Sequence, residues 1–113
     1  MSNKQRFLEY IRHYAAMRLD LVSAMLADNV TLRDWNISVS GKAAAVDETA
    51  KNFDSSERID IEVLGTYESN ETVAGELRIL VDEHIELYVV DVITFDPSGM
   101  ISAIRAYLGK GDN

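Results

Sequence analysis

Asp91 is the residue whose position in this sequence is most unusual. It lies inside the apolar segment Ile85 to Phe95, although aspartate is depleted in β-strands. On an extended chain its side chain shares one face with four apolar neighbours, Leu87, Val89, Ile93 and Phe95. If helices cover that face, the carboxyl group is buried, and a buried carboxyl group without a charged partner tends to stay protonated and able to donate a hydrogen bond. The alternative is an ion pair with Arg78 or Arg105.

Asp34 and Tyr10 are two further candidates for chemistry. Asp34 falls at the end of a short predicted strand, residues 30–35, directly before the large ring of Trp35. A carboxylate in that setting could act as a general base, whereas the alternatives are a turn aspartate or a surface pair with Arg33. Tyr10 lies on the apolar side of a predicted helix, where a buried hydroxyl needs a partner; the alternative is a core tyrosine.

The first half of the chain predicts three helices. Ser2 and Gln5 have the spacing of a capping box that starts the first helix, in which apolar residues recur at helical intervals. A second helix is predicted over residues 19–26. A third is predicted to begin after Ser40 as its cap. Its apolar stripe consists of Ala43, Val46, Ala50 and Phe53.

The second half predicts strands joined by turns. Residues 59–63, 73–81, 85–95 and 100–108 alternate in polarity or are apolar on both faces, and residues 36–41 are predicted as a loop. Turns are predicted at residues 68–71, 82–84 and 96–99; Pro97 and Gly99 favour the last one. Helices followed by hairpin-linked strands indicate an α+β fold with an antiparallel sheet.

Composition limits the class of protein. A length of 113 residues suits one domain, residues 1–113. The absence of cysteine excludes disulfides and thiol catalysis. A formal net charge of −8 argues against nucleic acid and membrane surfaces as partners. The N-terminus has no secretory pattern and no segment reaches the ~20 apolar residues of a spanning helix, so we expect a cytoplasmic protein.

The outer face of the predicted sheet is also apolar. Tyr88, Val90 and Val92 form a row opposite the face of Asp91, and the last strand continues it with Ile101, Ala103 and Tyr107. An antiparallel sheet with helices on one face should show polar residues on the other. We therefore expect a partner on this face, and a twofold-symmetric homodimer is the commonest solution.

Four segments carry a resemblance to a known family. They are AMLADNVTLRD at residues 24–34, GKAA at 41–44, DVITFDPSGMI at 91–101 and IRAY at 104–107. With the order of elements, they resemble the nuclear transport factor 2-like (cystatin-like cone) superfamily, in particular its ketosteroid isomerase and SnoaL-like branches, from about Phe7 to Gly109. The resemblance implies three helices packed on a curved antiparallel sheet, forming a cone with an apolar pocket.

The resemblance also implies roles for the three candidates. Tyr10 matches the oxyanion-hole tyrosine of the ketosteroid isomerase pattern, Asp34 the general base and Asp91 the protonated aspartate. Asp34 would then move a proton on a hydrophobic ketone while Tyr10 and Asp91 stabilise the enolate oxygen, with no cofactor and no metal. Trp35 replaces a proline often found after the base, and its bulk could narrow the pocket. The alternatives are a SnoaL-like polyketide cyclase, which needs one acid/base carboxylate and no tyrosine, or a non-catalytic domain for small-ligand binding or dimerisation.

Overall fold

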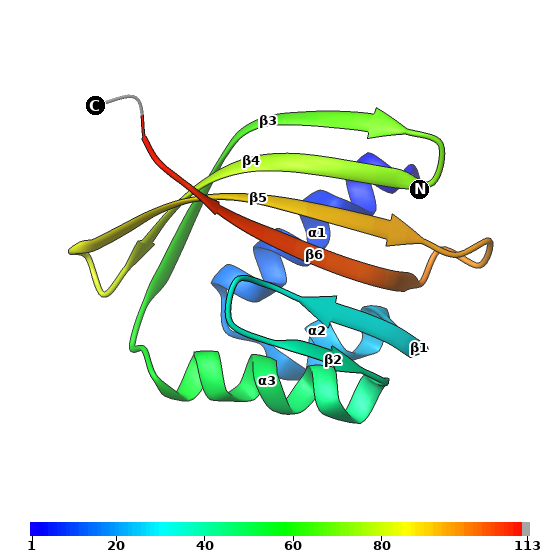
Figure 1. Cartoon of the computed structure of the whole chain (residues 1–113), viewed down its shortest axis with the longest axis horizontal. Helices are drawn as coiled ribbons and strands as arrows, with labels where there is room; N and C mark the ends of the chain where they lie inside the picture. Colours follow the sequence, from blue (N-terminus) through cyan, green and yellow to red (C-terminus); the bar gives the residue numbers. More distant parts are fainter. Residues whose placement is uncertain (112–113) are drawn as a thin grey trace.

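Helices and strands follow one another in the predicted order, with one additional short strand at Ser38–Ser40 (Figure 1). The computed structural model describes residues 1–111, and within that range it has three helices and six strands. The helices are α1 Asn3–Ala15, α2 Leu19–Met25 and α3 Lys42–Asp54. The strands are β1 Leu26–Arg33, β2 Ser38–Ser40, β3 Ile59–Ser69, β4 Thr72–Val81, β5 Ile85–Phe95 and β6 Ile101–Gly109. None of the helices in residues 1–111 is long and apolar enough to span a membrane.

All six described strands form one curved sheet in the order β2-β1-β6-β5-β4-β3. Neighbouring strands are antiparallel except β1 and β6, which run parallel, so the sheet is mixed where a wholly antiparallel one was predicted. Parallel strands need a long crossover, and here α3 and the β3–β5 hairpins provide it. Register shifts between Val63 and Gly65 and between Thr94 and Phe95 add curvature.

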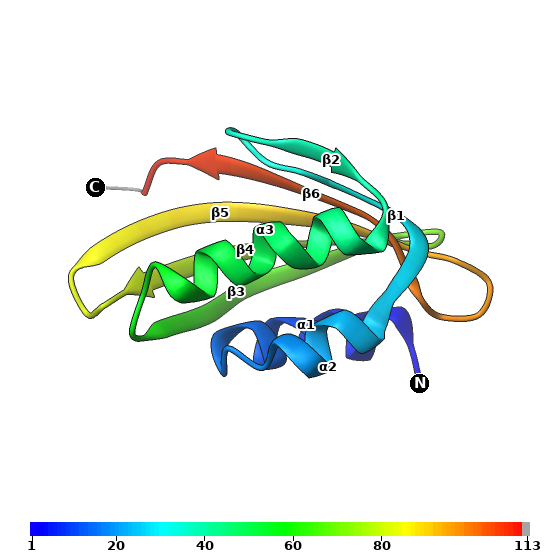
Figure 2. The ribbon, with the colours of Figure 1, turned by 90° about the horizontal axis from the view of Figure 1, so that it is seen from below.

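The three helices lie on the same, concave side of the sheet (Figure 2). Helix α1 begins at the predicted capping box, in which Gln5 N donates to Ser2 Oγ (3.1 Å) and Ser2 N donates to Gln5 Oε1 (2.8 Å). It packs against β3 and β4, while α3 packs against β1 and β2. The fully buried side chains between helices and sheet include Phe7, Leu26, Leu77, Ile93, Phe95 and Ile101.

Helix α3 differs from its prediction at its start and on its buried face. Ser40 belongs to β2, where it pairs with Thr31, and Gly41 occupies the cap position with φ +94° and no side-chain cap. The predicted loop 36–41 therefore contains a short strand. The residues of α3 that are buried are Ala45, Thr49 and Phe53, whereas Ala43 is exposed. A threonine can take part in the buried face because its hydroxyl donates to the carbonyl of Ala45 (2.8 Å).

Two strands also differ from their predictions. Strand β1 begins at Leu26 instead of Val30, and its pairing with β6 is irregular between Leu26 and Thr31. Ile101 was predicted on the outer sheet face but is fully buried in the core. The register shift next to Phe95 explains this, since it pairs Ile101 with Phe95 on the inner face.

Candidate active site

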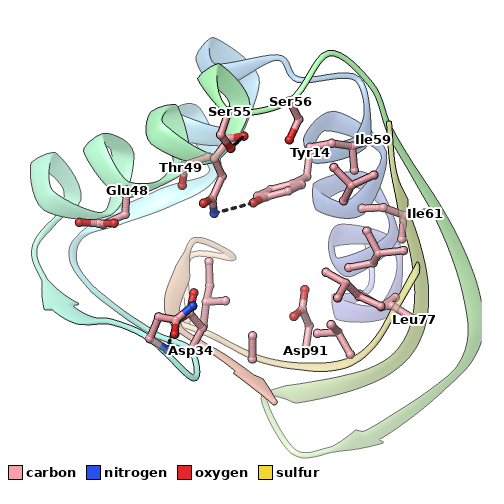
Figure 3. Close-up of a pocket in the computed structure, with 18 of the residues that line it drawn as sticks. Tyr14, Asp34, Glu48, Thr49, Ser55, Ser56, Ile59, Ile61, Leu77 and Asp91 are labelled. Atoms are coloured by element: carbon pink, nitrogen blue, oxygen red, sulfur yellow. Dashed lines mark hydrogen bonds between the residues drawn. The ribbon is translucent and has the colours of Figure 1, made fainter. Parts of the chain in front are cut away.

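A cavity of about 670 Å³ lies between the concave face of the sheet and helices α1 and α3 (Figure 3). Ligand sites for small molecules are typically about 300–1,000 Å³. The sheet side of the cavity is mainly aliphatic and includes Ile61, Leu77, Ile79, Leu87, Val89 and Ile104. Most polar groups come from α3 and the segment after it and from the loop after β1, and Tyr10 and Tyr14 of α1 and Asp91 of β5 add three more. Such a wall suits an apolar molecule that carries a few polar groups.

Asp91 lies in the middle of β5, with its carboxyl group pointing into the cavity (Figure 3). Its Cα partners are Gly75 on β4 and Ala106 on β6. Neither candidate arginine reaches it: Arg105 donates to Thr94 Oγ1 (2.9 Å) and Arg78 Nε donates to Glu86 Oε2 (2.8 Å). Within residues 1–111 Asp91 forms no ion pair, so the predicted alternative of a salt bridge is wrong.

Asp91 is half-buried in the cavity wall with no cation beside it, and this setting changes its ionisation. Desolvation raises the pKa of its carboxyl group from the ordinary value to about 7. The direction is the one predicted from its apolar neighbours. Near neutral pH, a large fraction of Asp91 is therefore a carboxylic acid that can donate a hydrogen bond into the cavity.

Tyr10 of α1 is a second donor in the wall of the same cavity. Tyr10 is 4% exposed. Within the described residues its hydroxyl has no hydrogen-bond partner, but the oxygen is not completely enclosed by protein atoms. Burial raises the pKa of this phenol well above its ordinary value, and charge repulsion from Asp91 and from the ionised phenol of Tyr14 raises it further. Tyr10 is thus neutral at physiological pH, and its proton is available to a molecule in the cavity.

Asp34 follows the end of β1 and also lines the cavity. Its Oδ1 accepts hydrogen bonds from the backbone N–H groups of Asn36 (2.7 Å) and Ile37 (2.9 Å). The carboxylate therefore holds the tight turn between β1 and β2, as the turn alternative predicted. Arg33 is not its partner, because Arg33 donates to the hydroxyl of Tyr107 (3.0 Å) instead. The second carboxylate oxygen makes no hydrogen bond among the described residues.

Trp35 forms part of the cavity wall without filling the cavity. Trp35 is 45% exposed, so it extends partly into solvent next to Asp34. The cavity remains large enough for a ligand despite the bulk of this residue. The structure thus brings Tyr10, Asp34 and Asp91 to one open cavity.

The two histidines lie elsewhere. His13 contacts Glu9 (3.3 Å) within α1, and His84 Nδ1 contacts the carbonyl of Asp82 (2.6 Å) in the turn after β4. Within residues 1–111 no three histidine, aspartate or glutamate side chains gather where they could hold a metal ion.

A family model for the SnoaL-like domain matches residues 7–104. The chain belongs to this family. No curated protein matches the sequence significantly. Many solved structures share the fold of this SnoaL-like chain.

Three of these structures illustrate the similarity in fold. An NTF2-like protein of unknown function from Cytophaga hutchinsonii has a TM-score of 0.81 at 14% identity, covering 96% of this chain and 91% of its own. SalBIII, an epoxide hydrolase/cyclase-like enzyme in pyran ring formation of the polyether salinomycin, has a TM-score of 0.83 at 22% identity, covering 95% and 90%. A candidate ketosteroid isomerase from Kribbella flavida has a TM-score of 0.83 at 12% identity, covering 98% and 80%. At these identities the likeness shows the fold, which is the predicted NTF2-like cone.

Sequence reasoning missed two polar residues of the SnoaL-like cavity, Tyr14 and Asn52. Asn52 Nδ2 donates to the Tyr14 hydroxyl (3.1 Å), which joins α1 to α3 at the cavity wall. Tyr14 could have been found, because it follows Tyr10 by four residues and therefore lies on the same helix face. Asn52 could not, because the predicted stripe of α3 was rotated relative to its actual buried face.

Proposed function

We propose that this SnoaL-like protein is a cofactor-free isomerase that moves a proton through an enolate on a hydrophobic ketone. The observation that carries the proposal is the convergence of two neutral donors, Tyr10 and Asp91, with the carboxylate of Asp34 in one mainly apolar cavity. This set provides a base and two donors for a developing negative charge.

The reaction follows from these three groups. With the ketone oxygen between Tyr10 and Asp91, the free carboxylate oxygen of Asp34 removes a proton from the carbon next to the carbonyl group. The C–H electron pair forms the enolate, whose oxygen accepts hydrogen bonds from Tyr10 and protonated Asp91. Asp34 then returns a proton, either the original one or one exchanged with solvent, to a conjugated carbon further along, so the double bond moves and no net proton is gained or lost.

The surroundings favour this chemistry. Hydrogen bonds to a developing oxyanion are strongest in a site shielded from water, and the sheet side of the cavity is aliphatic. Asp91 can donate only while it is protonated, and its pKa of about 7 keeps that form populated at neutral pH. Tyr10, with its raised pKa, remains a donor throughout the physiological range.

A SnoaL-like cyclase is the second candidate, and Asp91 is the observation that favours it. A carboxyl group with a pKa of about 7 can both donate and accept a proton at neutral pH. One such residue satisfies the need of a cyclase for a single acid/base group. This candidate does not require Tyr10, so a variant that removes the Tyr10 hydroxyl separates the two functions.

Enolisation itself is the property to test. Wild-type protein would be incubated in D2O with a 3-oxo-Δ5-steroid, and NMR would follow both deuterium uptake next to the carbonyl group and formation of the conjugated isomer. The proposal expects both at rates far above the buffer reaction. Exchange on other cyclic ketones without steroid turnover would support enolisation as the reaction and reject steroids as the substrate class. The absence of both exchange and isomer formation on every ketone would refute the proposed function.

A further inference from the structure

The hydroxyl of Tyr14 is a cavity group that the proposed reaction leaves unused. Tyr14 lies one helical turn beyond Tyr10, and the two ring centroids are 5.9 Å apart. Its ring also packs edge-on against Phe53 of α3, with centroids 4.9 Å apart. These contacts fix the direction of the ring, and its hydroxyl points into the cavity from the wall across from Asp91 (Figure 3).

Asn52 of α3 completes a polar pair with this hydroxyl. Asn52 Nδ2 donates to Tyr14 Oη (3.1 Å), so the phenol proton is left to be donated elsewhere. Within residues 1–111 neither that proton nor Asn52 Oδ1 has another partner. If the amide turned over, the phenol would donate to Oδ1 and the amide N–H would become the free donor. In both arrangements the pair keeps at least one donor and one acceptor for a ligand.

The charges around the cavity determine which ligands are compatible with this pair. Four acidic residues line the cavity, Asp34, Glu48, Asp82 and Asp91, against one basic residue, Lys51. Lys51 already pairs with Glu48 (3.2 Å). Asp91 is partly protonated near neutral pH, so the net negative charge comes mainly from Asp34 and Asp82. An anionic ligand would therefore enter against a negative potential, and a neutral ligand would not.

On the basis of the proposed isomerase function, we propose that Tyr14 and Asn52 form a second polar subsite. It holds a second carbonyl or hydroxyl group of an uncharged, mainly aliphatic ring ketone, apart from the reacting carbonyl group. The pair thereby orients the substrate, because a ligand held at two points has fewer ways to lie in the cavity.

Binding of matched ligands tests this subsite without requiring turnover. The ligands are three 3-oxo-Δ4-steroids that differ at C17, with no oxygen, a carbonyl group or a carboxylate. Trp35 is the one tryptophan of the chain and lines the cavity, so its fluorescence reports binding. We expect wild type to bind the 17-carbonyl ligand about five- to tenfold more tightly than the ligand without oxygen, and the carboxylate at least about tenfold more weakly than the carbonyl.

Variants assign the preference to the pair. Tyr14→Phe and Asn52→Ala should reduce the preference for the 17-carbonyl ligand to less than about twofold. Tyr107→Phe removes a hydroxyl from the outer sheet face and should keep the full preference. Equal binding of the first two ligands by wild type, or a preference that survives Tyr14→Phe, would overturn the subsite and leave the isomerase intact. Tightest binding of the carboxylate would also overturn it, whereas failure of every steroid to bind would reject the subsite and the steroid isomerase together.

Discussion

The ring of Phe7 lies directly over Gly75, at a place where a β-carbon would overlap the ring. Gly75 is the Cα partner of Asp91 on the neighbouring strand, and Phe7 is fully buried. Tyr10 follows Phe7 by three residues and lies on the same side of α1. The contact therefore anchors the helix that carries Tyr10 to the part of the sheet that carries Asp91.

Gly75→Ala tests this anchor. The added methyl group must displace the Phe7 ring, and overpacking of this kind costs about 1–3 kcal/mol of the free energy of unfolding. Gly109→Ala is the matched control, since a β-carbon there meets one backbone oxygen at 3.6 Å, an ordinary contact. Urea unfolding of both variants gives the comparison. Equal stability of the two variants would contradict the role of the close approach.

Asp91→Asn should change how stability depends on pH. The folded-state pKa of about 7 is raised above the unfolded value of about 3.9, so the native state holds the proton more tightly. Proton binding by Asp91 therefore stabilises the fold fully below about pH 4, and this contribution is lost as pH rises to about 7. It amounts to roughly 4 kcal/mol for three pKa units.

The measurement is the difference in unfolding free energy between wild type and Asp91→Asn from pH 4 to 8. Taking the difference cancels the pH dependence that the other carboxylates contribute to both proteins. Asparagine keeps a hydrogen-bond donor and does not ionise. The stability of the variant should therefore increase relative to wild type as pH rises, and the difference should level off above pH 7. A difference that stays constant with pH would show that Asp91 titrates normally.

Tyr10→Phe should separate catalysis from stability. The Tyr10 hydroxyl has no partner among the described residues, so its loss should change the free energy of unfolding little. Loss of one donor to an oxyanion typically lowers kcat by about 10²–10³-fold. Steady-state kinetics on the ketone substrate would measure this. An unchanged kcat would favour the cyclase candidate, which needs no tyrosine.

The face of the sheet opposite the cavity gives a prediction on assembly. We propose that a second copy covers it. Tyr107 is 48% exposed there, beside the row that contains Val90. Arg33 and Arg105 are neighbours on one side of that row, and Glu76 lies on the other. A twofold axis parallel to β5 would bring Arg33 and Arg105 of each copy toward Glu76 of its partner.

Light scattering at micromolar concentration tests the assembly. Wild type should have about twice the chain mass of 12.6 kDa, and Val90→Lys should have the single-chain mass, because it places a charge at the centre of the row. The exposed change Asp28→Lys is the control and should leave the dimer intact. A single-chain mass for wild type would refute the dimer.

Local patterns were enough to predict most elements but not their arrangement. Strand β5 and the turn at Pro97 were predicted because polarity and turn chemistry are properties of neighbouring residues. The parallel contact of β1 with β6 joins residues at opposite ends of the chain, such as Leu32 and Ile104, and leaves no local signal. Asp91 stood out because a charge in an apolar strand is unusual. The Asn52 contact with Tyr14 depends on how α3 is rotated, which packing decides.

Conversion of a 3-oxo-Δ5-steroid by Asp34→Asn tests the central claim most directly. The asparagine carbonyl oxygen can still accept the two backbone hydrogen bonds that hold the turn, so the fold and the thermal stability should be retained, while the base is lost. We predict that wild type and the exposed control Asp28→Asn form the conjugated isomer and that Asp34→Asn forms none above the buffer rate. If the Asp34→Asn variant is folded and converts the steroid at the wild-type rate, the assignment of Asp34 as the base is contradicted.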